Sequence, residues 1–235
     1  MNVAFYATKI QAQVMKEREQ TEYAYERYAD ATLFWCFVDL VESSNFRIVH
    51  GPKEGYVRGE TFFSLVNAVI APCPDIRVVK EIGDATFLAA PSFRPLLESV
   101  VLIDQAARQL AAVAATTEFP FDIRAAIGFG PAKRLTRPHE DFLGTPIDQL
   151  ARIMTVRSET AKLFLHEHAY APSVEILREY QTFLQVGEPD MVTAASSKHM
   201  LRPVFYRELK VNREALVEFR DHFVPWRAPK GSTTS

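Results

Sequence analysis

The chain has 235 residues, of which 48% are hydrophobic, so it is long enough for one large core, alone or with short arms. Its 27 basic residues nearly balance its 29 acidic residues, which leaves no broad basic surface for nucleic acid and no polybasic tail for a membrane. No stretch approaches the roughly 18 consecutive apolar residues of a membrane span. We therefore expect no nucleic-acid and no membrane partner.

The cysteines favour a reducing compartment. Cys36 and Cys73 are the only two, and both stand in apolar surroundings without the paired spacing of a disulfide framework or a zinc site. The N-terminus lacks a long apolar core with basic flanks, so it does not resemble a secretion signal. We expect a cytoplasmic protein.

The first half of the chain predicts an arm followed by alternating strands and helices. Residues 1–30 form the expected arm, because Lys9 to Asp30 is polar and free of Pro and Gly, as in an amphipathic helix. Thr32 to Val41 is an apolar run with one embedded acid, which is typical of a buried strand with a functional group near its end. The elements expected next are a loop over Ser43–Glu60, a helix over Thr61–Ala71, a hairpin of Ile76–Lys80 and Ala85–Ala89, and a helix over Arg94–Ala115.

The second half completes an α+β pattern. Its expected elements are a strand over Asp122–Gly130, a helix over Gly144–Val156, and further strands over Lys162–His168, Phe183–Val186 and Pro203–Leu209. The order strand, helix, hairpin, helix, strand indicates a ferredoxin-like βαββαβ core with additional C-terminal strands, an α/β sandwich with its helices on one face of a mainly antiparallel sheet. Residues 31–210 would form this domain, and residues 211–235 a C-terminal helix and polar tail.

Two carboxylates from distant parts of the chain are candidates for metal binding. Asp39 ends the first strand, and Asp84 lies in the hairpin turn, so the two side chains can converge. Paired carboxylates suit Mg²⁺ or Mn²⁺, and a pair of such ions can activate a hydroxyl while neutralising phosphate charge. The alternatives are an ordinary turn aspartate at Asp84 and an exposed strand-end acid at Asp39.

Four segments in order resemble the catalytic domain of class III nucleotide cyclases, the adenylate and guanylate cyclase family. They are FVDLVESSNF, VVKEIGDATFLA, IRAAIGFGPAKRL and DFLGTPIDQLAR, which together span about Thr32 to Arg152. The resemblance implies an enzyme that closes a nucleoside triphosphate into its 3′,5′-cyclic monophosphate and releases pyrophosphate, with two Mn²⁺ or Mg²⁺ ions per site.

The same resemblance implies a role for each matching residue. Metal would be held by Asp39, the Leu40 carbonyl and Asp84; phosphate by the backbone of Val41, Glu42, Ser43 and Ser44; the base by Lys80 and Asp141; and the transferring phosphoryl group by Arg152. Ordinary surface or loop positions are the alternatives for Lys80, Asp141 and Arg152. The resemblance also implies a homodimer whose composite sites place Asp39, Asp84 and Lys80 against Asp141 and Arg152 of a partner.

Two positions depart from the family pattern. Asp148 stands where the family has an asparagine that orients the ribose, and a carboxylate cannot donate the amide hydrogen bond. Its charge would repel phosphate unless it is protonated or paired, Arg152 being one candidate partner. Lys198 has the spacing of the family's triphosphate lysine, but HMLR replaces the usual glycine-containing segment after it.

Hydrogen-bond logic leaves the base open. Lys80 and Asp141 offer a donor and an acceptor that suit adenine, cytosine and uracil alike. The short chain, the residue Asp148 and the bulky Asn45-Phe46-Arg47 are similar to the pyrimidine cyclases of bacterial antiphage (Pycsar) systems. That resemblance favours UTP or CTP and implies an antiviral signal read by a separate effector protein. The alternatives are an adenylate cyclase, a degenerate nucleotide-binding protein, and another palm-like phosphotransferase, although no GGDEF segment is present.

Overall fold

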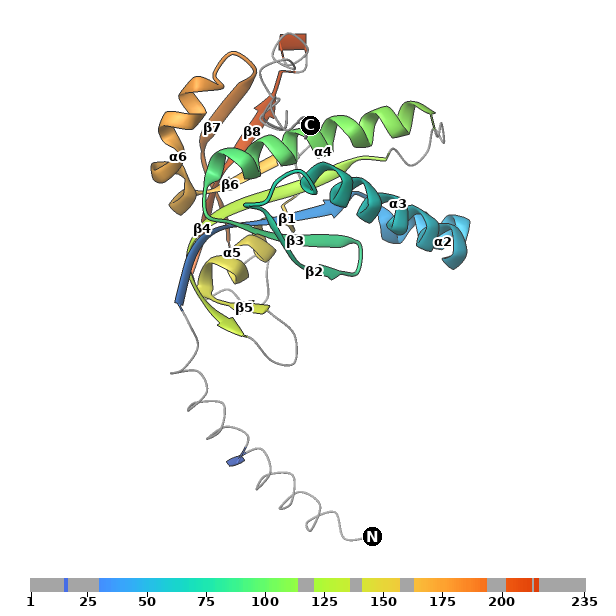
Figure 1. Ribbon diagram of the computed structural model, residues 1–235, viewed down its shortest axis with the longest axis horizontal. Helices are drawn as coiled ribbons and strands as arrows, with labels where there is room; N and C mark the ends of the chain where they lie inside the picture. Colours follow the sequence, from blue (N-terminus) through green and yellow to red (C-terminus); the bar gives the residue numbers. More distant parts are fainter. Residues whose placement is uncertain are drawn as a thin grey trace, which may run out of the picture.

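The central strand of the sheet is β1 (Asp30–Leu40), which pairs antiparallel with β3 on one side and β4 on the other. The computed structural model describes residues 15–16, 30–113, 121–135, 141–156, 163–193, 202–212 and 214–215. Its eight-stranded sheet has the order β2-β3-β1-β4-β6-β8-β7, and β5 pairs with β4 outside that path. The pairing of β4 with β6 is parallel, and the other recorded pairings are antiparallel (Figure 1).

The remaining elements alternate along the chain. The helices are α2 (Ser43–His50), α3 (Pro52–Ile70), α4 (Phe93–Val113), α5 (Thr145–Ile153) and α6 (Glu167–Glu179). The other strands are β2 (Arg77–Ile82), β3 (Ala85–Ala90), β4 (Ile123–Leu135), β5 (Asp141–Leu143), β6 (Leu163–His166), β7 (Leu184–Val192) and β8 (Val204–Val211). The α/β architecture expected from the sequence is confirmed.

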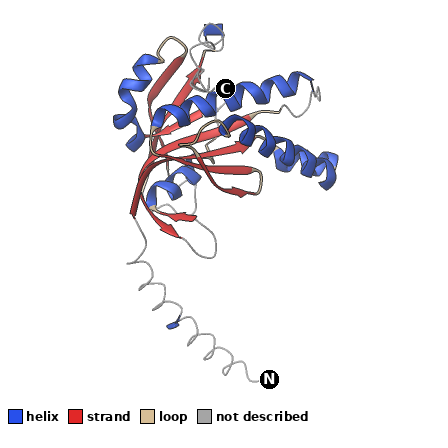
Figure 2. Cartoon of the chain, viewed as in Figure 1, coloured by secondary structure: helices blue, strands red, loops and turns tan. Residues whose placement is uncertain are grey.

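Side chains of β1 alternate between two cores, as a strand requires. Phe34, Cys36 and Val38 join the core beneath α3, α4 and α6. Trp35 and Phe37 join a second, smaller core that includes Leu150 and Ile153 of α5. The prediction that all helices cover one face is therefore wrong, because α5 packs on the other face of the sheet (Figure 2).

The predicted loop over Ser43–Glu60 is also wrong, because these residues form α2 and most of the first half of α3. Gly51 lies between the two helices. Helix α3 begins at Pro52, because proline is well tolerated in the first turn of a helix. Polar and glycine-rich composition suggested a loop here, yet Gly55 and Gly59 lie inside a helix that packs Phe62 and Val66 into the core. The helix predicted from Thr61 is its C-terminal half.

Later elements were predicted in part. The hairpin, the helix α4 and the strands β4, β6, β7 and β8 occur where the sequence predicts them, although β4 and β7 extend further. Strand β5 and helix α6 were not predicted. Helix α6 follows β6 without a loop, because His166 is both the last strand residue and the N-cap of the helix. Its internal Pro172 falls in the second turn.

The predictions for the two ends lie almost wholly outside the described residues. Of the expected arm, only residues 15–16 and 30 are described, and Asp30 already belongs to β1. Of residues 211–235, only 211–212 and 214–215 are described. Within the described residues, no helix combines the length and the apolar character needed to cross a bilayer.

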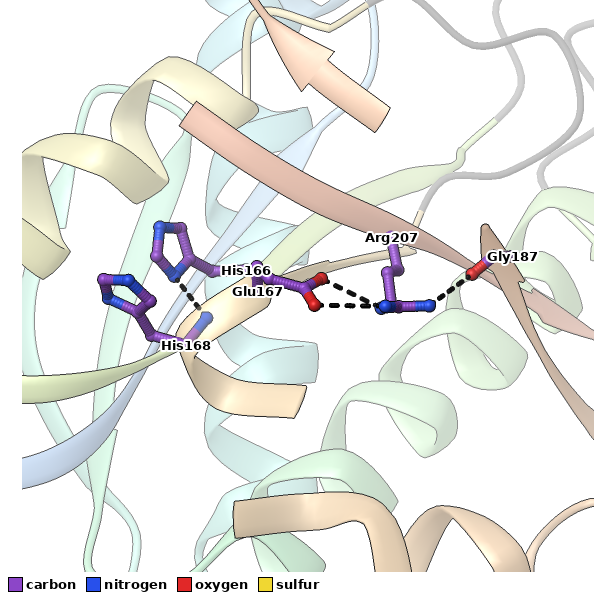
Figure 3. Close-up of polar contacts among 5 residues, drawn as sticks. All are labelled: His166, Glu167, His168, Gly187 and Arg207. Carbon is purple, nitrogen blue, oxygen red and sulfur yellow. Dashed lines mark hydrogen bonds and ion pairs between the residues drawn. The ribbon is translucent and has the colours of Figure 1, made fainter. Parts of the chain in front are cut away.

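A polar cluster holds the junction between β6 and α6 (Figure 3). The Nδ1 atom of His166 accepts a hydrogen bond from the backbone N–H of His168 at 3.1 Å. Arg207 of β8 donates to both carboxylate oxygens of Glu167, at 2.9 and 3.0 Å. Burial lowers the pKa of His166 to about 4, and the nearby His168 adds to the effect. Because an acceptor nitrogen carries no proton, the capping interaction requires a neutral His166.

We predict that His166 makes the fold sensitive to acid. Its pKa of about 4 lies below the ordinary value of 6.5, so between these pH values the unfolded chain binds a proton that the folded chain does not. This residue should therefore cost at most about 3 kcal/mol of stability as pH falls from 6.5 to 4, and nothing further below 4. His166→Asn keeps a capping oxygen without a titrating group. Chemical denaturation across this range should give a shallower pH dependence for His166→Asn, and an unchanged slope would contradict the assignment.

Candidate active site at the end of the first strand

The fold places Asp39 and Asp84 side by side. Asp39 is paired with Ala85 across β1 and β3, and Asp84 is the residue before Ala85 in the hairpin turn. The backbone N–H of Leu40 donates to the carbonyl of Asp84 at 3.2 Å, which ties the strand end to the turn. Gly83 has a φ of +66°, a left-handed conformation that glycine adopts without strain, and this allows a turn of only two residues.

The electrostatics of these two acids fit a divalent cation. Burial, followed by the negative charge of Asp84, raises the pKa of Asp39 to about 6, while Arg124 and the Leu40 N–H oppose the increase. A cation between the carboxylates would remove their repulsion. The described residues contain no group of three or more His, Cys, Asp or Glu side chains suited to a metal ion. The donors expected here are thus two carboxylates and the Leu40 carbonyl, all hard oxygen ligands of the kind Mg²⁺ and Mn²⁺ prefer.

The segment after Asp39 forms a tight turn into a helix N-terminus. The Val41 N–H donates to the carbonyl of Asp122 at 2.9 Å, and the Val41 carbonyl accepts from Arg58 Nη2 at 3.3 Å. Glu42 has a φ of +57°, unusual for a residue with a side chain, and precedes the first residues of α2, Ser43 and Ser44. The first backbone N–H groups of a helix are free of intrahelical partners and attract anions. Ser43 and Asp84 line the same pocket, so the predicted phosphate-binding segment lies beside Asp84.

Lys80 and Asp141 lie in contact within one chain. Lys80 Nζ donates to Asp141 Oδ2 at 2.6 Å, and Asp141 Oδ1 accepts from the backbone N–H of Phe142 at 2.7 Å. This corrects the expectation that Lys80 faces Asp141 of a partner. The two side chains meet because β5 carries Asp141 and the hairpin strand β2 carries Lys80, and their role in base binding stays a prediction.

An aromatic pair separates this ion pair from the metal-binding candidates. Phe37 and Phe87 stack with ring centroids 4.6 Å apart, and Phe87 is paired with Lys80 on the neighbouring strand. Cross-strand partners share a face of the sheet, so Lys80, Phe37 and Asp39 all lie on the face that carries α5. Lys80 and Asp39 therefore lie on the same face of the sheet, and Asp84 lies in the turn beside Asp39.

Asp148 and Arg152 lie one turn apart on α5. Asp148 is exposed and Arg152 is half-buried, and the structure records no ion pair between them, so Arg152 does not neutralise the carboxylate in this arrangement. Lys198, the expected triphosphate lysine, lies outside the described residues.

Arg124 is a site residue that the sequence analysis missed. It is paired with Asp39 across β1 and β4, and its charge lowers the pKa of Asp39. Its Nη1 atom donates to the carbonyl of Met154 at 2.8 Å, which links the strand end to the C-terminus of α5. The signal was a lone arginine in the apolar strand segment IRAAIGFG, where a buried charge requires a partner.

Solved structures with the same fold are nucleotide cyclases. The adenylyl cyclase CyaB from P. aeruginosa aligns over 77% of this chain and 94% of its own, with a TM-score of 0.63 and 12% identity. The guanylyl cyclase Cya2 aligns over 78% and 94%, with a TM-score of 0.61 and 14% identity. The dimeric guanylyl cyclase domain of the RhoGC fusion protein from Blastocladiella emersonii aligns over 78% and 98%, with a TM-score of 0.55 and 13% identity.

No protein-family model and no curated protein matches the chain. At such low identity the structural matches establish the fold, which is that of class III cyclase catalytic domains.

We predict that the ionised Asp39 destabilises the metal-free protein. Its pKa of about 6 exceeds the ordinary 3.8, so the destabilisation grows as pH rises through 6 and is absent below 3.8. Asp39→Asn should raise the melting temperature at pH 8 by roughly 2–4 °C, or about 1 kcal/mol. Thermal denaturation in a chelator would measure this effect. The exposed Asp148→Asn serves as the control, and no increase at pH 8 would refute the repulsion.

Proposed function

We propose that the chain is a nucleotide cyclase that converts a nucleoside triphosphate into its 3′,5′-cyclic monophosphate and pyrophosphate. The observation that carries this proposal is the meeting of Asp39, Asp84 and the N-terminus of α2 at the end of the central strand β1 of a cyclase-type sheet. Carboxylates that repel each other beside free backbone N–H groups suit a metal-bound polyphosphate. The structures with this fold are adenylyl and guanylyl cyclases, which supports the same chemistry.

Each part of the site has a role in this reaction. Asp39 and Asp84 would hold two Mn²⁺ or Mg²⁺ ions, which supply charge neutralisation and activation of the attacking hydroxyl when bound. The α2 N–H groups position the phosphates, and Lys80 with Asp141 positions the base. The ribose 3′-hydroxyl loses its proton and attacks the α-phosphate, a new P–O bond forms, and the bond to the pyrophosphate leaving group breaks. Arg152 stabilises the charge that develops on the phosphoryl oxygens.

Asp148 would accept a hydrogen bond from a ribose hydroxyl, whereas the asparagine usual at this position in the family donates one from its amide. Its exposed position at the first turn of α5 puts the carboxylate near a helix N-terminus, where negative charge is favourable. This role preserves orientation of the sugar while changing the direction of the hydrogen bond.

We favour UTP or CTP as the substrate and propose that the cyclic pyrimidine nucleotide is an antiviral signal for a separate effector protein. The support is the resemblance carried by Asp148. The bulky segment Asn45-Phe46-Arg47 lies in α2, where Phe46 packs against His50 and Arg58. Lys80 and Asp141 present a donor and an acceptor compatible with either pyrimidine.

We predict a metal-dependent cyclic nucleotide product. Purified protein is incubated with ATP, GTP, CTP and UTP separately, with Mn²⁺ or Mg²⁺, and the products are identified by mass spectrometry. Arg152→Ala should lower turnover by about 10²–10³-fold, because it removes charge stabilisation of the transition state. Asp39→Ala should abolish the product.

Each result of this assay has a defined meaning. A cyclic pyrimidine nucleotide supports the full proposal, and cyclic AMP replaces the pyrimidine assignment with an adenylate cyclase. No product from any triphosphate, together with retained nucleotide binding, would identify a degenerate cyclase.

A homodimer with composite sites is part of the proposal. Because Lys80 contacts Asp141 in the same chain, we assign the metal carboxylates Asp39 and Asp84 to one chain and the base-binding pair with Arg152 to the other. The RhoGC domain with this fold is described as a non-canonical dimer, so it supports dimerisation, and the composite sites rest on the family resemblance.

Mixing two inactive variants tests this arrangement. Asp39→Ala and Arg152→Ala each damage a different half of a composite site, so a mixed dimer should contain one intact site. We expect the mixture to recover up to about a quarter of wild-type activity, since half of randomly paired dimers are mixed and each has one of two sites. A mixture as inactive as its components, with exchange of subunits verified by native mass spectrometry, would place the whole site in one chain.

A further inference from the structure

A pocket of about 380 Å³ lies between α2, α3 and the turn that carries Asp84. The residues that line it and enter the argument are Ser43, Arg47, Gly55, Gly59, Glu60 and Asp84. Its inner wall includes the metal-binding candidate Asp84 and the first residue of α2, so the pocket continues directly from the proposed phosphate site. None of the roles expected from the sequence uses Arg47.

Arg47 is directed along this wall by its neighbours. Ser43 and Arg47 are four residues apart on α2, so they share a helix face, and both line the pocket. The Arg47 side chain lies against Gly55 of α3. A Cβ atom at Gly55 would come within 2.8 Å of Arg47 Cγ and 3.1 Å of its Cβ, closer than packed atoms tolerate. Glycine at position 55 therefore makes the space that the arginine occupies.

The charges of the pocket leave Arg47 available for an anion. Glu60 and Asp84 also line the pocket, but among the described residues no ion pair involves Arg47. Ser43 is only 7% exposed, and its Oγ atom has no hydrogen-bond partner among the described residues. A buried hydroxyl without a partner costs free energy, and such a group at the edge of a pocket suits a polar ligand.

We propose that Arg47 binds the terminal phosphates of the substrate and the departing pyrophosphate, in the pocket between α2 and α3. The inference rests on the proposed function, because it extends the same phosphate site outward from Asp84. A guanidinium is suited to phosphate because it donates paired hydrogen bonds and stays charged. The Gly55 surface holds its aliphatic stem, so that less side-chain entropy is lost on binding.

Pyrophosphate binding tests Arg47 independently of catalysis. Isothermal calorimetry with inorganic pyrophosphate and Mn²⁺ should show an affinity at least about tenfold weaker for Arg47→Ala, the loss of one charged hydrogen-bonded contact. Arg47→Lys should recover part of it. Lys53→Ala removes the same charge from α3 at a residue outside the pocket lining and should change the affinity less than twofold.

Substitutions at Gly55 and Gly59 test whether binding depends on where the Arg47 side chain lies as well as on its charge. Gly55→Ala leaves Arg47 in the sequence but displaces it, so it should weaken pyrophosphate binding as well. Gly59→Ala adds the same methyl group to the same wall, where no atom lies within 4 Å, and should have little effect. In the Arg47→Ala background, Gly55→Ala should cause no further loss, because the two substitutions act through one side chain.

The results distinguish this inference from the proposed function. Unchanged pyrophosphate affinity in Arg47→Ala, or equal losses in Gly55→Ala and Gly59→Ala, would overturn the role of Arg47 even if the enzyme forms a cyclic nucleotide. Conversely, Arg47-dependent pyrophosphate binding in a protein that cyclises no triphosphate would keep this anion site and reject the cyclase. In an active enzyme, Arg47→Ala should also weaken product inhibition by pyrophosphate to the same degree.

Discussion

The antiparallel pairing of β1 with both β3 and β4 is the constraint on which the rest of the structure depends. It places the buried side chains of β1 alternately against α3, α4 and α6 on one face and against α5 on the other, and it fixes which residues meet at the strand end. The same register that seats Phe37 on Phe87 sets Asp39 between Ala85 and Arg124. A slip by one residue would turn Asp39 into the helical core, where an unpaired charge is prohibitive. The register that packs the core therefore also sets the geometry of the candidate site.

The strand end concentrates features that oppose folding. Asp39 faces a second carboxylate while partly buried, and Glu42 holds a left-handed backbone that typically costs on the order of 1–3 kcal/mol. Contacts around Val41 hold this arrangement: its N–H donates to Asp122, whose side chain pairs with Arg108 at 2.9 Å, and its carbonyl accepts from the buried Arg58. Strained backbone held by contacts on both sides is expected in a turn that must have its binding conformation before the ligand binds.

The sequence predicted what depends on local pattern and missed what depends on distant contacts. An acid at the end of an apolar strand and another in a hairpin turn were enough to anticipate that Asp39 and Asp84 converge. Helix α2 and the first half of α3 were taken for a loop because their Gly, Pro, Asn and Ser residues outweighed a helical pattern that tertiary packing stabilises. The in-chain contact of Lys80 with Asp141 depends on β5, a three-residue strand too short to leave a periodic signal. Arg124 was overlooked because its partners, Asp39 and Met154, come from other elements.

In the proposed function, the pair of Lys80 with Asp141 and the pair of Asp39 with Asp84 would prepare for a ligand in opposite ways. Lys80 and Asp141 satisfy each other, but their side chains remain 38% and 29% exposed, and a pair in such a position contributes about 0–1 kcal/mol. A base that supplies an acceptor and a donor can replace that contact at little cost. Asp39 and Asp84 repel each other when both are ionised, and a cation bound between them relieves that repulsion. Binding of the base and of metal-bound phosphate would therefore draw on different sources of free energy: exchange of a weak ion pair for the base, and relief of repulsion for the metal-bound phosphate.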